Sequence, residues 1–137
     1  MIELTREEID ELLSEQVVGR VGCHVNGLTY VVPLIYAYDG DAVYVASIEG
    51  QKVEMMRANP AVSFEVASCG PEGWRRAIVQ GVYEELSEAE TPKALELLRE
   101  RFPANDSGRR RSPETHGRPT VCFRIGVHSV TGRAVIR

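Results

Sequence analysis

The stretch from Tyr44 to Lys52 combines residue types that could hold an anion where a strand passes into a helix. Ser47 ends the expected strand, Gly50 lets backbone approach closely, and Lys52 falls in the first turn of the expected helix. Backbone N–H groups, the positive end of the helix dipole and an ammonium would then converge on one point, which suits a phosphate. Taken alone the pattern is weak, because ordinary strand-to-helix connections contain the same residue types.

A second cluster consists of Trp74, Arg75 and Arg76, which place the only tryptophan and two cations at the start of an expected strand. These residues could contact a ligand. They could equally close one end of the fold, with the arginines paired to acidic helices. The residues by themselves leave both interpretations open.

Other kinds of reactive site are not indicated. The chain has no G-x-S-x-G, G-x-G-x-x-G or G-x-x-x-x-G-K-[ST] motif. Its histidines and cysteines are few, and they are not spaced as metal ligands or as a disulfide framework. They are His24, His116, His128, Cys23, Cys69 and Cys122. We therefore expect no metal site and assign no catalytic residue, although His128, expected in a short link between the last two strands, could donate a proton.

Length and composition restrict the possibilities further. The chain has 137 residues, 43% of them hydrophobic, and a net charge of −4. That length supports one hydrophobic core, so we expect a single domain over residues 1–137. The negative charge argues against nucleic-acid binding. No apolar run approaches the roughly 18 residues of a membrane span, and the acidic start differs from a signal peptide, so we expect a cytoplasmic protein without membrane contact.

The elements that must position these clusters are mostly strands. Apolar residues alternate with period two, and Asn-Gly and Asp-Gly pairs mark tight hairpin turns. Capping signals, prolines and period-3.6 stripes mark helices. The pattern predicts strands over 17–25, 28–38, 42–47, 61–67, 77–86, 121–127 and 130–136, helices over 5–15, 50–58 and about 91–102, and a long, mobile loop over 103–119.

Hairpin connections exclude a doubly wound parallel sheet. Closing the strands into a barrel would remove most exposed sheet edges. The sequence therefore predicts a mainly β protein, a small antiparallel barrel of six or seven strands with short flanking helices.

Five short pieces, in order over nearly the whole chain, resemble the pyridoxamine 5′-phosphate oxidase-like split barrels that bind flavin, and among them the branch grouped with nitroimidazole-resistance proteins. Their order and spacing carry the resemblance more than any single piece. The pieces are 19–22 (GRVG), 30–38 (YVVPLIYAY), 50–52 (GQK) with Asn59-Pro60, 74–76 (WRR) with Gly81, and 131–133 (TGR).

The resemblance implies a split barrel that forms a homodimer, with flavin mononucleotide (FMN) bound in grooves between the subunits. It also implies ten cofactor contacts. These are Val32, Pro33 and Leu34 along the isoalloxazine, Ala46, Ser47, Gly50 and Lys52 around the ribityl phosphate, and Trp74, Arg75 and Arg76 from the partner subunit. The anion pattern and the resemblance meet at Lys52, so we favour the phosphate interpretation.

Two residues depart from the family pattern. Ala46 stands where many similar proteins carry a histidine, which argues against histidine-dependent reduction or haem ligation. Gln51 stands where the phosphate oxidases tend to have arginine, which argues against oxidation of vitamin B6.

The favoured function is an FMN-dependent oxidoreductase acting on a small electron acceptor or electrophile, because the cofactor supplies the chemistry and the protein orients it. One alternative is a non-catalytic protein that binds or senses flavin or haem. Another is a deazaflavin-dependent reductase, whose acidic cofactor tail would need further cations such as Arg109 to Arg111.

Overall fold

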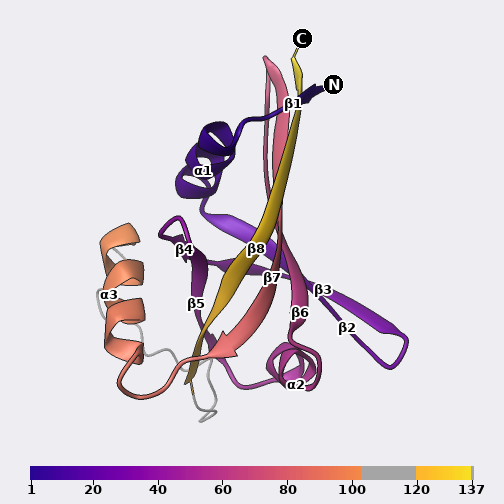
Figure 1. The fold of residues 1–137 in the computed structure, drawn as a ribbon. Helices are drawn as coiled ribbons and strands as arrows, with labels where there is room; N and C mark the ends of the chain where they lie inside the picture. The colour runs from indigo at the N-terminus through magenta and orange to yellow at the C-terminus, as the bar shows by residue number, and fades with distance from the viewer. Residues whose placement is uncertain (103–119, 137) are drawn as a thin grey trace.

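The computed structural model describes residues 1–102 and 120–136. In this part of the chain, eight strands form one antiparallel sheet and three helices pack against it (Figure 1). The elements are β1 (Ile2–Glu3), α1 (Arg6–Glu15), β2 (Val18–Val25), β3 (Leu28–Ile35), β4 (Ala37–Tyr38), β5 (Ala42–Ile48), α2 (Gln51–Ala58), β6 (Ala61–Gly70), β7 (Gly73–Glu85), α3 (Thr91–Arg101) and β8 (Thr120–Ile136). The predicted class is confirmed, whereas the loop predicted over 103–119 lies outside the described residues.

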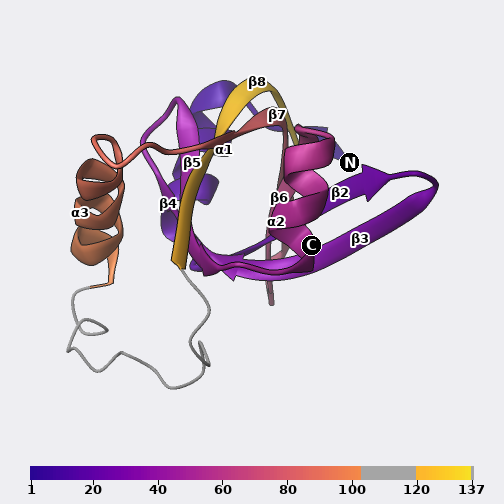
Figure 2. The same ribbon diagram turned by 90° about the horizontal axis from the view of Figure 1, so that it is seen from below.

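The sheet follows the order β3-β2-β6-β7-β8-β5-β4, with β1 added to β8. Figure 2 shows how it curls round on itself. The two end strands, β3 and β4, follow each other in the chain at Tyr36, yet among the described residues no strand pairing joins β3 to β4 or β5. The barrel is therefore split along this line and is not closed.

The tight turns lie where their dipeptides predict them. Asn26 and Gly27, with φ of 51° and 83°, connect β2 to β3 in a two-residue hairpin. Gly40, with φ of 99°, lies in the turn between β4 and β5. These positive φ values are the ones that asparagine and glycine tolerate best.

The last two predicted strands are one strand. β8 runs unbroken for 17 residues and pairs with the 13-residue β7. Gln80 pairs with Ser129 and Gly81 with Val127, so the extra residue His128 is taken up in a bulge. The expectation that His128 lies in a link was wrong, because a bulge absorbs one residue without turning the chain.

The β6–β7 hairpin is also longer than predicted. Its strands extend to Gly70 and from Gly73, so Trp74 to Arg76 lie inside β7 and not ahead of it. Gly73 has a φ of 127°, and a Cβ at this position would overlap the backbone of β8. Glycine at this position lets the hairpin turn beside its neighbour.

The core lies between the inner faces of the curled sheet and α1. Leu12 and Leu13 of α1 are fully buried there, as is Phe64 of β6. The Phe64 ring packs edge to face on Tyr36, with the ring centroids 4.9 Å apart. It fills the space beside Gly19, where a Cβ would overlap it. The Gly19–Phe64 contact thus sets how closely β2 packs on the core.

Both ends of α1 are held by side chains. At the start, Thr5 and Glu8 form the predicted capping box, in which the Glu8 N–H donates to Thr5 Oγ1 at 3.1 Å. At the other end the Arg101 guanidinium donates to the carbonyls of Glu15 and Gln16 at 3.1 and 2.6 Å. These bonds tie α3 to α1. None of the helices in the described ranges is long and apolar enough to span a membrane.

Candidate functional site

The predicted anion-binding turn is the connection between β5 and α2. Gly50 is the N-cap residue of α2 and has no side chain with which to bond the first amides of the helix. The helix's own hydrogen bonds begin with the Glu54 N–H, which donates to Gly50 O at 3.1 Å. Earlier amides of a helix have no acceptor within it, so they can point toward a ligand.

The surroundings of the turn leave room for such a ligand. A Cβ placed on Gly50 would meet nothing within 4 Å. Lys52, in the first turn of α2, is half-buried. Its ammonium lies near enough to Cys23 of β2 to oppose the effect of burial, which raises the pKa of that thiol.

The two residues that end β5 form the other side of the turn. Ala46 is exposed and pairs with Cys122 of β8, and Ser47 pairs with Val121. The Ser47 hydroxyl donates to the carbonyl of Ile48 at 3.3 Å. Because β4 covers only Val43 and Tyr44, the end of β5 has a free edge in the described part of the sheet.

The residues expected to line the isoalloxazine lie on a second free edge. β3 pairs only with β2 among the described strands, with Val32 opposite Val21 and Leu34 opposite Gly19. Val32 and Leu34 pack inward against the core, while Pro33 is exposed. It is therefore the backbone of this edge that is available to a planar ring. Both free edges border the split in the barrel.

The Trp74 cluster lies at the other end of the molecule. Trp74 pairs with Cys69 and with Val135, one residue from the start of β7. The chain leaves α2 and enters β6 at Ala61, eight residues from Cys69, which is roughly 26 Å along a strand. Figure 1 shows α2 and the β6–β7 turn at opposite ends of the sheet.

Within one chain, the residues of the Trp74 cluster contact each other and the end of α1. The Arg76 guanidinium lies over the Trp74 ring, 5.9 Å from its centroid. Arg75 Nη2 lies 3.4 Å from Glu15 Oε1 at the end of α1, which is the acidic pairing that the structural interpretation expected. The turn and the β3 edge therefore both border the split, whereas the tryptophan cluster lies at the opposite end of the chain from the turn.

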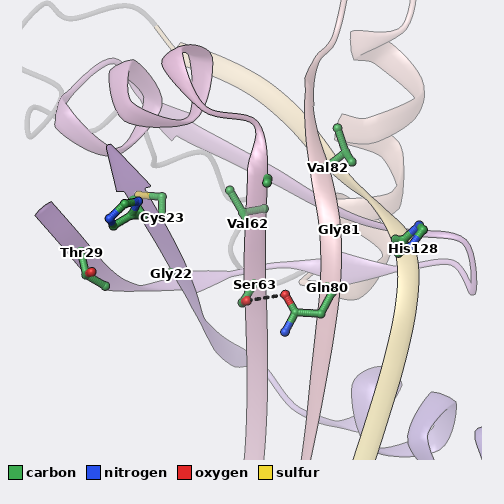
Figure 3. Close-up of a pocket in the computed structure, with 11 residues that line it drawn as sticks. Gly22, Cys23, Thr29, Val62, Ser63, Gln80, Gly81, Val82 and His128 are labelled. Atoms are coloured by element: carbon green, nitrogen blue, oxygen red, sulfur yellow. Dashed lines mark hydrogen bonds between the residues drawn. The ribbon is translucent and has the colours of Figure 1, made fainter. Parts of the chain in front are cut away.

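Sequence reasoning missed a groove of about 670 Å³ on the outer face of the sheet. It extends across β3, β2, β6, β7 and β8, with Gly22 and Thr29 on one side and His128 on the other (Figure 3). On its floor the Ser63 hydroxyl donates to Gln80 Oε1 at 2.7 Å. Period-two alternation marks these positions as outward-facing, but only the register places them side by side.

The side chains that commonly bind metal ions are dispersed in the described ranges, 1–102 and 120–136. No three His, Cys, Asp or Glu side chains come together there in a group able to hold a metal ion. Cys23 is buried and its neighbour His24 is exposed, so adjacent residues of β2 face opposite ways as the strand period requires.

Comparisons with known proteins agree with this architecture. A solved FAD-binding protein from Mesorhizobium loti shares 35% sequence identity, covers 96% of this chain and 94% of its own, and superposes with a TM-score of 0.76. A candidate 5-nitroimidazole antibiotic resistance protein from Bacteroides thetaiotaomicron has the same fold at 21% identity, with a TM-score of 0.80 over 97% of this chain and 86% of its own.

An uncharacterized protein of Rhizobium meliloti (strain 1021) is 34% identical over 84 residues, which are 61% of this chain. The match spans just over half, 56%, of that relative's length. The family model described as pyridoxamine 5′-phosphate oxidase matches residues 5–134, nearly the whole chain. The likeness seen in the sequence pieces is thus confirmed, and the chain belongs to the pyridoxamine 5′-phosphate oxidase family.

Proposed function

We propose that this protein binds a flavin, FMN, and acts as an FMN-dependent oxidoreductase on a small electron acceptor or electrophile. The observation that carries the proposal is the β5–α2 turn, where an uncapped helix start, an open Gly50 and a half-buried Lys52 lie together. Backbone amides and an ammonium in this arrangement suit a phosphate monoester. The flavin-binding relative from Mesorhizobium loti supports the same cofactor class.

Different residues of the chain would hold the phosphate and the ring of the cofactor. Gly50 and Lys52, with Ala46 and Ser47 beside them, would hold the phosphate, and the backbone of Val32 to Leu34 would contact the ring. A bound flavin supplies transfer of a hydride or of single electrons. The protein would orient the ring along the split and limit the access of water, and no side chain is given a catalytic role.

FAD is the second candidate cofactor, because the 35% identical Mesorhizobium loti protein is described as FAD-binding. FAD shares the flavin and its first phosphate with FMN but extends beyond them. The β5–α2 turn can account for that shared phosphate and says nothing of an adenylate. A titration with both cofactors therefore decides between them.

The test begins with the absorption spectrum of the purified protein. A bound flavin, released by denaturation and identified as FMN, supports the proposal. FAD as the released flavin would replace FMN as the cofactor, and a haem spectrum would support the haem-binding alternative. If the protein isolates without cofactor, titration with FMN, FAD, riboflavin and a deazaflavin gives the same answer.

Turnover separates the enzyme from a flavin carrier or sensor. An oxidoreductase should reoxidise its reduced flavin with added acceptors over many cycles when NAD(P)H or dithionite supplies electrons. A protein that binds stoichiometric flavin and shows no turnover across acceptor panels would be the non-catalytic binder.

The cytoplasmic location stays a prediction, to be checked by fractionation.

We also propose a homodimer whose two flavin sites lie between the subunits. The β5–α2 turn and the Trp74 cluster are at opposite ends of one chain, so only a second chain could bring both to one cofactor. Large apolar side chains are exposed on the outer face of β2, β3 and β7, which a second copy would cover. They are Val18 (49% exposed), Val31 (58%), Ile35 (49%) and Val82 (46%).

The dimer predicts a measurable mass. Light scattering at micromolar concentration should give about twice the 15.2 kDa of one chain. Val31→Lys, which places a charge in the middle of this face, should shift the mass toward the monomer. A wild-type mass of one chain would contradict the dimer.

The role of Trp74 gives a separate prediction. If Trp74 reaches the partner's flavin, bound FMN should quench the fluorescence of this sole tryptophan. Trp74→Ala should then lower FMN affinity by roughly two- to tenfold, the scale of an aromatic contact, with little change in the stability of the flavin-free protein. Should Trp74→Ala instead leave FMN affinity unchanged in a folded dimer, Trp74 would be structural, and Arg75 and Arg76 would lose their assignment as well.

A further inference from the structure

Arg57, in the last turn of α2, is engaged by two carboxylates at once. Its Nη1 and Nη2 donate to the two oxygens of Glu49 at 2.7 and 3.0 Å. Its Nε and Nη2 donate to the two oxygens of Glu85 at 2.7 and 3.0 Å. Planar, two-point pairs of this kind fix orientation as well as distance.

Each of the three residues belongs to a different segment. Glu49 immediately precedes Gly50 in the β5–α2 turn, Arg57 lies near the end of α2, and Glu85 is the last residue of β7. The Tyr83 hydroxyl donates to Glu85 Oε1 at 2.8 Å and holds that carboxylate in place. The Arg57 guanidinium therefore ties the turn to the helix and to the sheet.

The charges around Arg57 argue against direct binding of a phosphate by its guanidinium. Glu85 is held ionised, because the bond from Arg57 keeps the pKa of that carboxyl below its usual range. One guanidinium faces two carboxylates, so the group carries no surplus positive charge for a phosphate. Glu49 alone, next to the turn, would repel an anion. Its pairing with Arg57 offsets this repulsion and gives the turn a point of attachment.

We propose that Arg57 is a positioning residue: through Glu49 it holds the chain before Gly50 so that the first amides of α2 and Lys52 can meet a flavin phosphate together. The inference rests on the proposed function, since it concerns the same turn. It adds a residue that lies outside the ten expected contacts and acts without touching the cofactor.

The experiment compares Arg57→Gln, Glu49→Gln and their double variant with the wild type, measuring affinity for FMN and for riboflavin. Both single variants should bind FMN about three- to tenfold more weakly and riboflavin almost unchanged, since only FMN uses the turn. The double variant should lose no more than the worse single variant, because both changes break one contact. Arg57→Lys keeps the charge without the two-point geometry, so its FMN affinity should lie between those of the wild type and Arg57→Gln.

Arg124→Gln is the matched control. Arg124 Nε lies 2.6 Å from Glu84 Oε1 and its Nη2 lies 3.7 Å from Glu90 Oε2, so it is also an arginine between two carboxylates, of similar exposure, in a pairing that does not include Glu49. The control should leave the ratio of FMN to riboflavin affinity unchanged. Amide hydrogen exchange on the flavin-free proteins supplies a second readout. Residues 49–53 should exchange faster in Arg57→Gln and Glu49→Gln, and as in the wild type in Arg124→Gln.

The possible results distinguish failure of the proposed phosphate site from failure of the positioning role of Arg57. If wild-type protein does not prefer FMN to riboflavin, the proposed phosphate site fails, while the exchange data still report whether Arg57 holds the turn. If the wild type prefers FMN but Glu49→Gln binds it more tightly, Arg57 acts on the phosphate directly and the positioning role is overturned. An unchanged affinity ratio with unchanged exchange in folded variants also overturns it.

Discussion

Replacing Lys52 with alanine should weaken FMN binding by roughly ten- to hundredfold, about 1.5 to 3 kcal/mol, the scale of a hydrogen bond to a charged group. The reason is local: Lys52 is the cation in the first turn of α2, beside the open N-cap at Gly50. Riboflavin lacks the phosphate, so its affinity should hardly change. Isothermal titration or flavin fluorescence with both ligands measures the difference.

The chain offers a close control for this change, since its other lysine, Lys93, is exposed on α3. Lys93→Ala removes the same charge and should alter neither affinity. Equal losses for FMN and riboflavin in Lys52→Ala would mean that this lysine supports the fold and not the anion. Burial raises the pKa of the Cys23 thiol and the Lys52 ammonium offsets part of that rise, so Lys52→Ala should make the thiol less ionised at a given alkaline pH.

Truncating Phe64 should produce the largest loss of stability, about 3 to 5 kcal/mol, as for other large-to-small changes of buried aromatic residues. Phe64 is fully buried and packs against both Tyr36 and Gly19. Its removal leaves a cavity between β2, β6 and the start of β4. Urea unfolding of Phe64→Ala and wild type at equal protein concentration measures the change in the free energy of unfolding.

A substitution at Gly19 tests whether its contact with Phe64 limits how these two residues pack. Gly19→Ala alone should destabilise by about 1 to 3 kcal/mol, because its Cβ would overlap the Phe64 ring. In the Phe64→Ala background the same Cβ enters the vacated space, so the double variant should be more stable than the sum of the single changes predicts. Strict additivity would show that the two residues do not limit each other's packing.

The sequence predicted the local features well, for reasons that the structure makes plain. The hairpins at Asn26-Gly27 and Gly40 follow from residues that tolerate positive φ, and the capping box at Thr5 follows from side chains three residues apart. The β5–α2 turn belongs to the same class, since Ser47, Gly50 and Lys52 lie within six residues of the chain. Features made by neighbours in sequence can be recognised without knowing the fold.

Predictions failed where pairing partners override local signals. His128 was predicted to lie in a link between two strands, but β7 pairs with β8 on both sides of that point and a bulge absorbs the extra residue. The strand that follows the Trp74 cluster was predicted over 77–86, yet β7 begins at Gly73 and includes Trp74 to Arg76. Strand length is decided by the hydrogen bonds of the neighbouring strand, which a single sequence does not contain.

By itself, then, the sequence determined the mainly β class, the tight turns and the strand-to-helix connection that we predict to bind an anion, because each depends on residues a few positions apart. Only the tertiary structure decided which distant residues meet. The Arg57 guanidinium joins Glu49 to Glu85, 28 positions further along the chain than Arg57. The outer groove gathers residues from five strands, and the Trp74 cluster lies far from the turn. These arrangements follow from strand register and the curl of the sheet, in which a shift of one residue would turn every side chain to the opposite face.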